Sequence, residues 1–165
     1  MNGAVVVDKP SGPTSRAVVE EVKRALGARR AGHTGTLDPL ATGVLTVCVG
    51  EATKLVQFLA LDEKEYRATL RLGVRTDTLD IGGRVLSREE PSVTRAQVET
   101  VLAGLTGWRQ QIPPRFSAVK VRGKALYRWT RRGIDVEAPP REVEIHRIRI
   151  EEFRLPDVVF TVSCS

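Results

Sequence analysis

The sequence predicts an α+β fold in which helices flank a mixed, largely antiparallel sheet. Several segments alternate apolar and polar residues with the period of a half-buried strand, most clearly residues 66–72. Two others, residues 15–26 and 95–105, repeat their apolar residues at helical spacing. The chain has 165 residues, of which 41% are hydrophobic and 28% charged. That composition suits one globular domain with room for a small appendage.

The first part of the chain contains a strand, a helix and a long loop in the prediction. Residues 3–7 are a short apolar run typical of a strand, and a turn rich in proline and glycine follows. Thr14 or Ser15 can then cap a helix that reaches about residue 26, where Gly27 can end it. The next elements predicted are a loop over residues 28–43, a buried strand over 44–49 and a short helix over 53–60.

The later elements are predicted from alternation and from capping residues. Thr94 and Gln97 fit a capping box for the helix at 95–105. A long strand is expected over 143–153, and its alternation slips at His146 and Arg147, which indicates a bulge. The remaining predictions are loops over 76–83 and 110–115, strands over 84–87 and 117–121, a helix over 124–132 and a strand from 158 onward.

Composition excludes several classes of protein. No run of about 18 apolar residues is present, so no membrane span is expected, and the start of the chain lacks the features of a secretory signal. Cys48 and Cys164 are far apart and only two histidines are present, so a zinc site is not expected. A reduced, cytoplasmic setting is the simplest interpretation, and a secreted origin is the alternative. No protein partner is implied, and we expect a monomer.

Basic residues are unevenly distributed along a chain whose net charge is +6. The segment from residue 109 to 133 contains no acid, and its basic residues are Arg109, Arg115, Lys120, Arg122, Lys124, Arg128, Arg131 and Arg132. Aromatic residues are interleaved with these charges, and arginine forks match phosphate oxygens in pairs. The segment indicates a nucleic-acid interface, with a merely solvated basic face as the alternative.

The stretch RRAGHTGTLDPLATGVL, residues 29–45, contains the lone acid Asp38 in a loop of glycines and threonines. An Asp-Pro pair commonly starts a turn, which is the simplest explanation of this aspartate. The alternative is an ionised carboxylate suited to covalent or electrostatic catalysis, because no second acid stands beside it for paired acid–base hydrolysis.

The same loop contains His33, for which two roles are open. A loop histidine often binds a backbone carbonyl, whereas a functional one can stack or wedge beside a displaced base. The Gly-His-Thr-Gly-Thr run also allows a phosphate-binding enzyme that acts on small molecules. That third possibility is weak, since neither a Gly-Lys-Ser/Thr step nor a GxGxxG pattern is present.

Five segments together resemble the TruB family of tRNA pseudouridine synthases. They are RAGHTGTLDPLATGVLTVCVGEATK (30–54), VVVDKPSGPTS (5–15), KEYRATLRLG (64–73), RTDTLDIGG (75–83) and IPPRFSAVKVRGKALYRWTRRG (112–133). The similarity covers essentially the whole chain in order, and RTDTLDIGG is more similar to the bacterial, stand-alone type than to the RNA-guided type. The resemblance implies the pseudouridine synthase catalytic fold over residues 1–165.

The resemblance also implies roles for individual residues. Asp38 matches the nucleophile that attacks uracil or its ribose. Tyr66 matches the tyrosine that stacks on the flipped base and takes part in isomerisation, although its place on an alternating face by itself favours a core residue. His33 matches the histidine that packs against the RNA, and Lys9, with Pro10, a pair that supports the active-site loop. The further residues expected to contact RNA are Arg30, Thr36, Arg131 and Arg132.

The implied substrate is the uridine at conventional position 55 in the T-loop of tRNA. The implied reaction needs no metal or cofactor, since isomerisation rejoins C1′ to C5 without outside atoms. Family members continue into a KGTYIR-like motif that supplies another tyrosine and an arginine, whereas this sequence stops at Ser165. We therefore expect the N-terminal part of the catalytic domain, without a C-terminal RNA-binding module. A tRNA-binding or RNA-folding fragment without catalysis is the alternative function.

Overall fold

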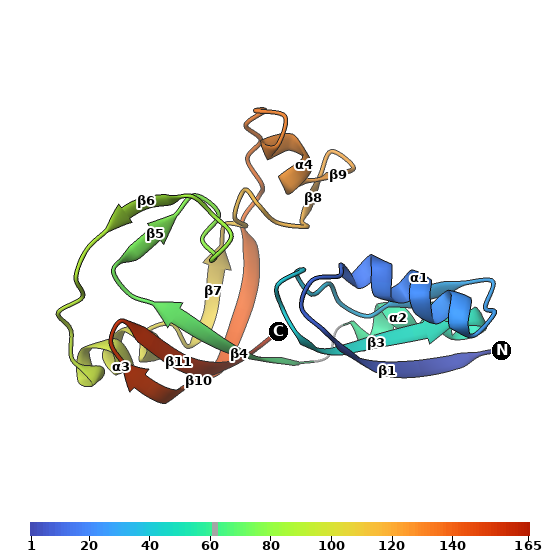
Figure 1. Cartoon of the computed structure of the whole chain (residues 1–165), viewed down its shortest axis with the longest axis horizontal. Helices are drawn as coiled ribbons and strands as arrows, with labels where there is room; N and C mark the ends of the chain where they lie inside the picture. Colours follow the sequence, from blue (N-terminus) through green and yellow to red (C-terminus); the bar gives the residue numbers. More distant parts are fainter. Residues whose placement is uncertain (61–62) are drawn as a thin grey trace. The chain divides into compact units, whose positions relative to one another are not determined.

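The computed structural model describes residues 1–60 and 63–165, and the chain divides into two compact units, Met1–Asp62 and Glu63–Ser165 (Figure 1). Every strand pair in the described residues is antiparallel, and the helices are few and short. The predicted α+β class with a largely antiparallel sheet is therefore confirmed.

The first unit contains a three-stranded sheet in the order β1-β3-β2. These strands are β1 (Gly3–Lys9), β2 (Ala31–His33) and β3 (Gly43–Val49). The central strand, β3, is the most apolar, and Leu45 and Val47 are 2% and 0% exposed. Burial of one such side chain contributes about 1.5–3 kcal/mol to folding. This sheet therefore gives the first unit a core of its own.

Helix α1 (Ser15–Ala25) packs against β2 and β3 (Figure 1). Thr14 is its N-cap, because the Thr14 hydroxyl accepts a hydrogen bond from the Ala17 backbone N–H at 3.1 Å. The chain leaves the helix through Gly27, whose φ of +59° favours glycine. The apolar residues that meet between α1 and the sheet are Val18, Val19, Leu45 and Val47, with Val7, Val22, Ala31 and Leu37 around them.

After β3 the chain forms the 3₁₀ helix η1 (Gly50–Leu55) and the short α2 (Val56–Leu59), where the sequence predicts one helix over 53–60. Gly50 begins this segment with a φ of +62°. A Cβ at Gly50 would lie 2.3 Å from the Met1 backbone carbonyl oxygen, so glycine is required against the residues that precede β1. Asn2 Oδ1 also accepts a hydrogen bond from the Glu51 N–H at 2.9 Å.

The second unit is built on a four-stranded sheet in the order β4-β11-β10-β7. Its strands are β4 (Lys64–Arg71), β7 (Gly107–Gln111), β10 (Arg141–Arg154) and β11 (Asp157–Cys164). The register of β10 against β11 shifts between Ile145 and Arg147, which confirms the predicted bulge, and again between Ile150 and Glu152.

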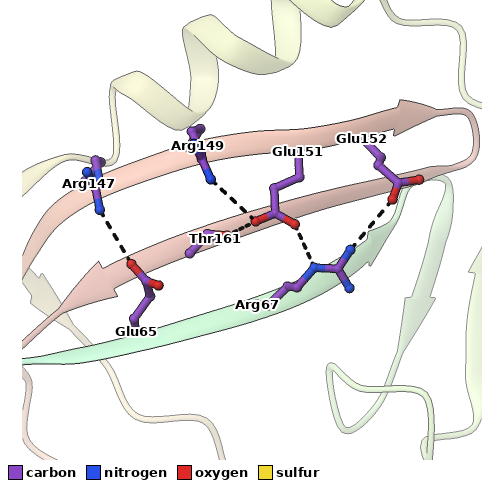
Figure 2. Close-up of polar contacts among 7 residues, drawn as sticks. All are labelled: Glu65, Arg67, Arg147, Arg149, Glu151, Glu152 and Thr161. Carbon is purple, nitrogen blue, oxygen red and sulfur yellow. Dashed lines mark hydrogen bonds and ion pairs between the residues drawn. The ribbon is translucent and has the colours of Figure 1, made fainter.

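This sheet has one polar and one apolar face, as the alternation of β4 predicts. On the polar face, Glu151 of β10 accepts hydrogen bonds from Thr161 of β11 and, at 2.7 Å, from Arg67 Nε of β4. Figure 2 shows these contacts with the neighbouring Arg147–Glu65 pair, in which Nη2 and Oε2 are 3.5 Å apart. On the opposite face, Val158 of β11 is fully buried.

Shorter elements connect these strands. They are the hairpin of β5 (Val74–Thr76) and β6 (Val85–Arg88), α3 (Arg95–Ala103), the hairpin of β8 (Lys120–Val121) and β9 (Lys124–Ala125), and α4 (Leu126–Thr130). Thr94 and Gln97 form the predicted capping box, since the Thr94 side chain accepts from the Gln97 N–H while the Gln97 side chain accepts from the Thr94 N–H.

Four predictions of elements were wrong. Of the strand expected over 117–121, only Lys120–Val121 pair, as β8. The loop expected over 28–43 contains β2, and the loop expected from residue 110 begins inside β7. The helix expected over 124–132 is shorter, because its first two residues pair as β9 and only Leu126–Thr130 are helical. In each case the strand has only two to five residues and is held by backbone hydrogen bonds. A strand this short shows no alternation of apolar residues by which the sequence could reveal it.

Candidate active site

The loop between β2 and β3, residues 34–42, carries Asp38 and Thr36. Its first residue is joined to the sheet by a hydrogen bond from the Thr34 N–H to the Thr46 carbonyl at 3.1 Å. Asp38 begins a turn, in which its carbonyl accepts from the Ala41 N–H at 3.0 Å, as expected for an Asp-Pro pair. The turn uses only the Asp38 backbone. Its exposed carboxylate makes no hydrogen bond or ion pair with any residue in 1–60 and 63–165.

Lys9, at the end of β1, holds the second half of this loop. Its side chain is fully buried, and Nζ donates to the carbonyls of Ala41 at 2.6 Å, Pro10 at 3.0 Å and Pro39 at 3.3 Å. An ammonium has three N–H donors, so all of them have an acceptor here. The Gly12 N–H also donates to the Pro39 carbonyl, at 2.7 Å. The Lys-Pro-Ser-Gly turn therefore fixes the backbone directly after Asp38.

Ser15, the first residue of α1, holds the half of the loop that precedes Asp38. Its hydroxyl donates to the Leu37 carbonyl and accepts from the Leu37 N–H, both at 2.9 Å. The sequence suggested Ser15 only as an alternative helix cap, and nothing in the local pattern pointed to a partner 22 positions away. The backbone is thus fixed on both sides of the exposed Asp38 carboxylate.

His33 and Arg30 flank the start of the same loop. His33 lies at the end of β2 opposite Val47, so it is a strand residue and not the loop residue that the sequence predicts. Its Nδ1 is buried and has no hydrogen-bond partner among the residues that the structure describes. Arg30 is exposed, and its carbonyl accepts from the Gly50 N–H at 2.9 Å. Thr36 is exposed within the loop.

Tyr66 lies in β4 of the second unit, opposite Val162 of β11. Its exposed fraction is 41%, although its neighbours on the same face, Ala68 and Val162, are less exposed. The alternative interpretation of Tyr66 as a core residue therefore does not hold within this unit. Asp38 and Tyr66 belong to different units, and the structure describes each of them within its own unit.

The basic segment of the second unit surrounds α4. The guanidinium groups of Arg131 and Arg128 lie 5.4 and 5.9 Å from the centre of the Tyr127 ring, and Lys124 Nζ lies 5.0 Å from the Trp129 ring. The hydrogen bond and positive charge of Arg128 hold the pKa of the Tyr127 hydroxyl below its ordinary value. Aromatic rings and cations are thus stacked on one another around this helix.

The basic residues of this segment do not all remain available. Arg109 is half-buried and donates to the Gly104 carbonyl at 3.1 Å, and Arg115 pairs with Asp135 at 2.8 Å. Arg132, in contrast, is exposed and forms no ion pair in the described part of the chain. The residues near α4 are therefore the stronger candidates for contact with phosphates.

Two further findings concern metals and membranes. Within residues 1–60 and 63–165, no group of three or more histidine, cysteine, aspartate or glutamate side chains could hold a metal ion. Across the same ranges, the helices are too short or too polar to cross a membrane.

A comparison with models of protein families shows to which family the chain belongs. Residues 23–165 match the model of the TruB family pseudouridylate synthase N-terminal domain. The chain belongs to the TruB family. The matched range contains Asp38 with its loop, Tyr66 and the basic segment around α4.

The curated relatives of this TruB-family chain include enzymes named tRNA pseudouridine synthase B. The sequence is 56% identical to the one from Syntrophus aciditrophicus over 165 residues and 49% identical to the one from Geotalea uraniireducens over 166 residues. Each alignment covers 100% of this chain, but only 53% and 54% of the respective relatives. The chain thus spans about half the length of the curated relatives it matches.

Solved structures of the same fold include a Cbf5-Nop10-Gar1 complex and an H/ACA RNP bound to a substrate RNA containing 2'-deoxyuridine. The TM-scores are 0.70 and 0.67, at 31% and 28% sequence identity. Both comparisons cover 98% of this chain, and they cover 39% and 37% of the chains compared. The TruB-family chain therefore has the pseudouridine synthase fold of these neighbours.

Proposed function

We propose that this chain carries the uridine-isomerising centre of a tRNA pseudouridine synthase, with Asp38 as the nucleophile. The observation that carries the proposal is the contrast between the Asp38 side chain and its backbone. The carboxylate is exposed and has no partner among the described residues, whereas Lys9 and Ser15 hold the loop on either side of it. A nucleophile needs a reacting group that is free to meet the substrate and a backbone that is held in place.

The proposed reaction breaks the N-glycosidic bond between C1′ and N1 of a uridine and joins C1′ of the ribose to C5 of the base. C5 loses its hydrogen as a proton to water and N1 gains one, so the product is an isomer of the substrate. Attack by the Asp38 carboxylate on the base or the sugar gives a covalent intermediate, which resolves without any atom from a cofactor. The target base must first leave its stack, at a cost of a few kcal/mol. Stacking on an aromatic ring returns about 1–3 kcal/mol, and the exposed Tyr66 ring is the group we assign to that role.

The proposed substrate is the T-loop uridine of tRNA at conventional position 55. The names of the relatives support tRNA as the class of substrate. The net charge of +6 and the exposed arginines near α4, Arg131 and Arg132, support contact with its phosphates. Arg30, Thr36 and His33 are the residues we expect to meet the RNA around the Asp38 loop. A cytoplasmic monomer is part of the same proposal, and light scattering with and without tRNA tests the monomer.

Release of tritium from tRNA labelled at C5 of its uracils tests this function. The wild-type chain should release the label, and Asp38→Ala should release none. Asp38→Asn preserves the shape of the side chain, so its tRNA affinity should stay within about twofold of wild type while turnover is lost. A loss of tRNA binding together with turnover in Asp38→Asn would count against a nucleophilic role.

The alternative function is a tRNA-binding fragment without catalysis, which the exposed arginines near α4 favour. Its signature is salt-sensitive tRNA binding by the wild-type chain without tritium release. That result would reject the catalytic proposal for this chain, whereas release that depends on Asp38 would reject the alternative.

A further inference from the structure

The Ser15 hydroxyl makes two hydrogen bonds to a single residue of the Asp38 loop. Ser15 Oγ donates to the Leu37 carbonyl at 2.9 Å and accepts from the Leu37 N–H at 2.9 Å. Ser15 is 2% exposed, so water does not replace either bond. Leu37 immediately precedes Asp38. Both backbone polar groups of the residue before the proposed nucleophile thus depend on one side chain.

The position of Ser15 in α1 explains why its hydroxyl is free for this task. Thr14 caps the helix by accepting from the Ala17 N–H. Ser15 is the first helical residue and has no capping role, so neighbouring hydroxyls perform separate functions. Val18 and Val19, one turn further on, are buried in the core. Ser15 therefore connects the loop to an element that is itself held by packing.

Hydrogen bonds from two side chains hold the backbone on either side of Asp38. Ser15 fixes Leu37 on one side, and Lys9 Nζ fixes the Pro39 and Ala41 carbonyls on the other. We propose that Ser15 is a positioning residue, which sets the direction of the Asp38 carboxylate by fixing the peptide that precedes it. This inference rests on the proposed function of Asp38, and it adds a residue that does not touch the substrate.

Kinetics of Ser15→Ala, with Thr14→Ala as the matched control, test this inference. A misplacement of about 1 Å can reduce a rate by about a hundredfold. Ser15→Ala should therefore lower kcat for tritium release by about tenfold or more and leave KM for tRNA within about twofold. Thr14→Ala removes the adjacent hydroxyl and the helix cap, so it should lower Tm and leave kcat within about twofold.

Two kinetic outcomes would overturn the proposal. One is a kcat for Ser15→Ala within about twofold of wild type, and the other is an equal loss of kcat in Thr14→Ala. Ser15→Thr retains a hydroxyl that can both donate and accept, so it should recover most of the lost kcat. A failure of Ser15→Thr to recover kcat, in a variant whose Tm equals that of wild type, would also count against the proposal.

Amide hydrogen exchange gives a readout that does not need turnover. In Ser15→Ala, the Leu37 amide should exchange faster, while the paired amides of β3 keep their protection. Unchanged exchange at Leu37 would overturn the inference, and loss of protection throughout β3 would assign Ser15 a general structural role instead. If the wild-type chain releases no tritium, the proposed function fails for this chain, and the exchange result alone decides whether Ser15 holds the loop.

Discussion

At the scale of single residues, Lys9 is the most unusual side chain of the first unit. Lysine is rarely buried unless it is paired, and Lys9 is completely inaccessible. Within residues 1–60 and 63–165, its charge is compensated by three carbonyl oxygens and not by a carboxylate. Two of those carbonyls belong to the Asp38 loop, so the stability of this unit and the geometry of the proposed site depend on the same ammonium group.

We predict that Lys9→Met lowers the free energy of unfolding by about 2–4 kcal/mol, because it removes a charged donor from three carbonyls in a part-buried site. A polar group left unsatisfied in such a site costs about 1–3 kcal/mol, and the Pro39 carbonyl still accepts from the Gly12 N–H. Methionine has a similar length and flexibility, so the loss reports the ammonium and not the packing. Urea denaturation followed by circular dichroism measures this difference.

The control for this prediction is Lys54→Met. The Lys54 side chain is 72% exposed, and its only ion pair in the described part of the chain is with Glu51, three residues earlier. Its replacement should change the free energy of unfolding by no more than about 0.5 kcal/mol. Equal effects of the two substitutions would show that the Pro10, Pro39 and Ala41 carbonyls do not need Lys9 as a donor.

Sequence reasoning predicted the site residues unevenly at this scale. Asp38, Lys9 and Tyr66 were named from motifs that resemble a family, and their catalytic or supporting roles remain predictions. Ser15 was missed because its partner, Leu37, is distant in the chain and no periodicity connects them. The surroundings of His33 were also missed, since burial of one ring nitrogen depends on packing that a loop composition does not report.

At the scale of elements, the polar face of the β4-β11-β10 sheet is held by charge as well as by backbone pairing. Arg71 and Asp157, directly opposite one another, form two hydrogen bonds of 2.8 and 2.7 Å. Hydrogen bonds from Thr161 and then from Arg67 hold the pKa of Glu151 below its ordinary value. Figure 2 shows that Glu151 is the acid contacted from all three strands.

These contacts predict a pH dependence. A carboxylate whose pKa is lower in the folded than in the unfolded state stabilises the fold above its unfolded pKa, and this contribution is lost as pH falls through the folded pKa. From about pH 7 to about pH 3, Tm of the wild-type chain should therefore fall more than Tm of Glu151→Gln. Thermal melts at several pH values measure the two slopes.

Glu21→Gln is the control for this pH experiment. Glu21 is exposed on α1 and forms no ion pair within residues 1–60 and 63–165. Its Tm should follow that of wild type at each pH. Parallel curves for wild type and Glu151→Gln would contradict the prediction, because they would show that Glu151 binds its proton equally well in both states.

Alternation was a good guide to the long strands and a poor one to the short ones. β4 and β10 were predicted, with the bulge of β10, because one face of each is apolar and the other polar. β7 reads Gly-Trp-Arg-Gln-Gln and pairs only with β10, so it lies at the edge and needs no apolar pattern. β2 has three residues, too few for any period to be visible.

At the scale of the whole molecule, four arginines of the sheet are paired with acids, whereas among the described residues most cations around α4 are not. Four arginines of the sheet's polar face form ion pairs with four acids, so these eight residues add nothing to the net charge of +6. They are Arg67, Arg71, Arg147 and Arg149 with Glu65, Glu151, Glu152 and Asp157. Residues 109–133 contain no acid, and among the described residues the cations of this segment form one ion pair, Arg115–Asp135. Contact with RNA is therefore expected at α4 and not on the sheet.

We predict that Arg131→Gln/Arg132→Gln weakens tRNA binding and reduces its salt dependence. Log K for tRNA binding falls as log salt rises, and each lost phosphate contact makes this negative slope smaller in magnitude by about 0.7–0.9. In the double variant, the magnitude of the slope should therefore fall by about 1.5 if both guanidinium groups contact phosphates. Fluorescence anisotropy of labelled tRNA, repeated over a range of salt concentrations, measures the slope.

Arg149→Gln is the matched control for the salt experiment. It also removes one positive charge, but from a guanidinium whose Nη2 lies 3.8 Å from Glu151 Oε1. Its slope should equal that of wild type. An unchanged slope in the Arg131/Arg132 variant, or an equal loss in Arg149→Gln, would exclude α4 as the phosphate-binding region.

Because Lys9 holds the Asp38 loop, the conformation of the loop should not depend on the ions in the buffer. The backbone carbonyls around the Lys9 ammonium resemble the carbonyl oxygens with which proteins bind a monovalent cation such as potassium. Here the cation is tethered to β1 and cannot be exchanged, diluted or removed by a chelator. The conformation of the Asp38 loop should accordingly be indifferent to the choice of sodium or potassium and to dialysis, even where tRNA binding itself responds to salt.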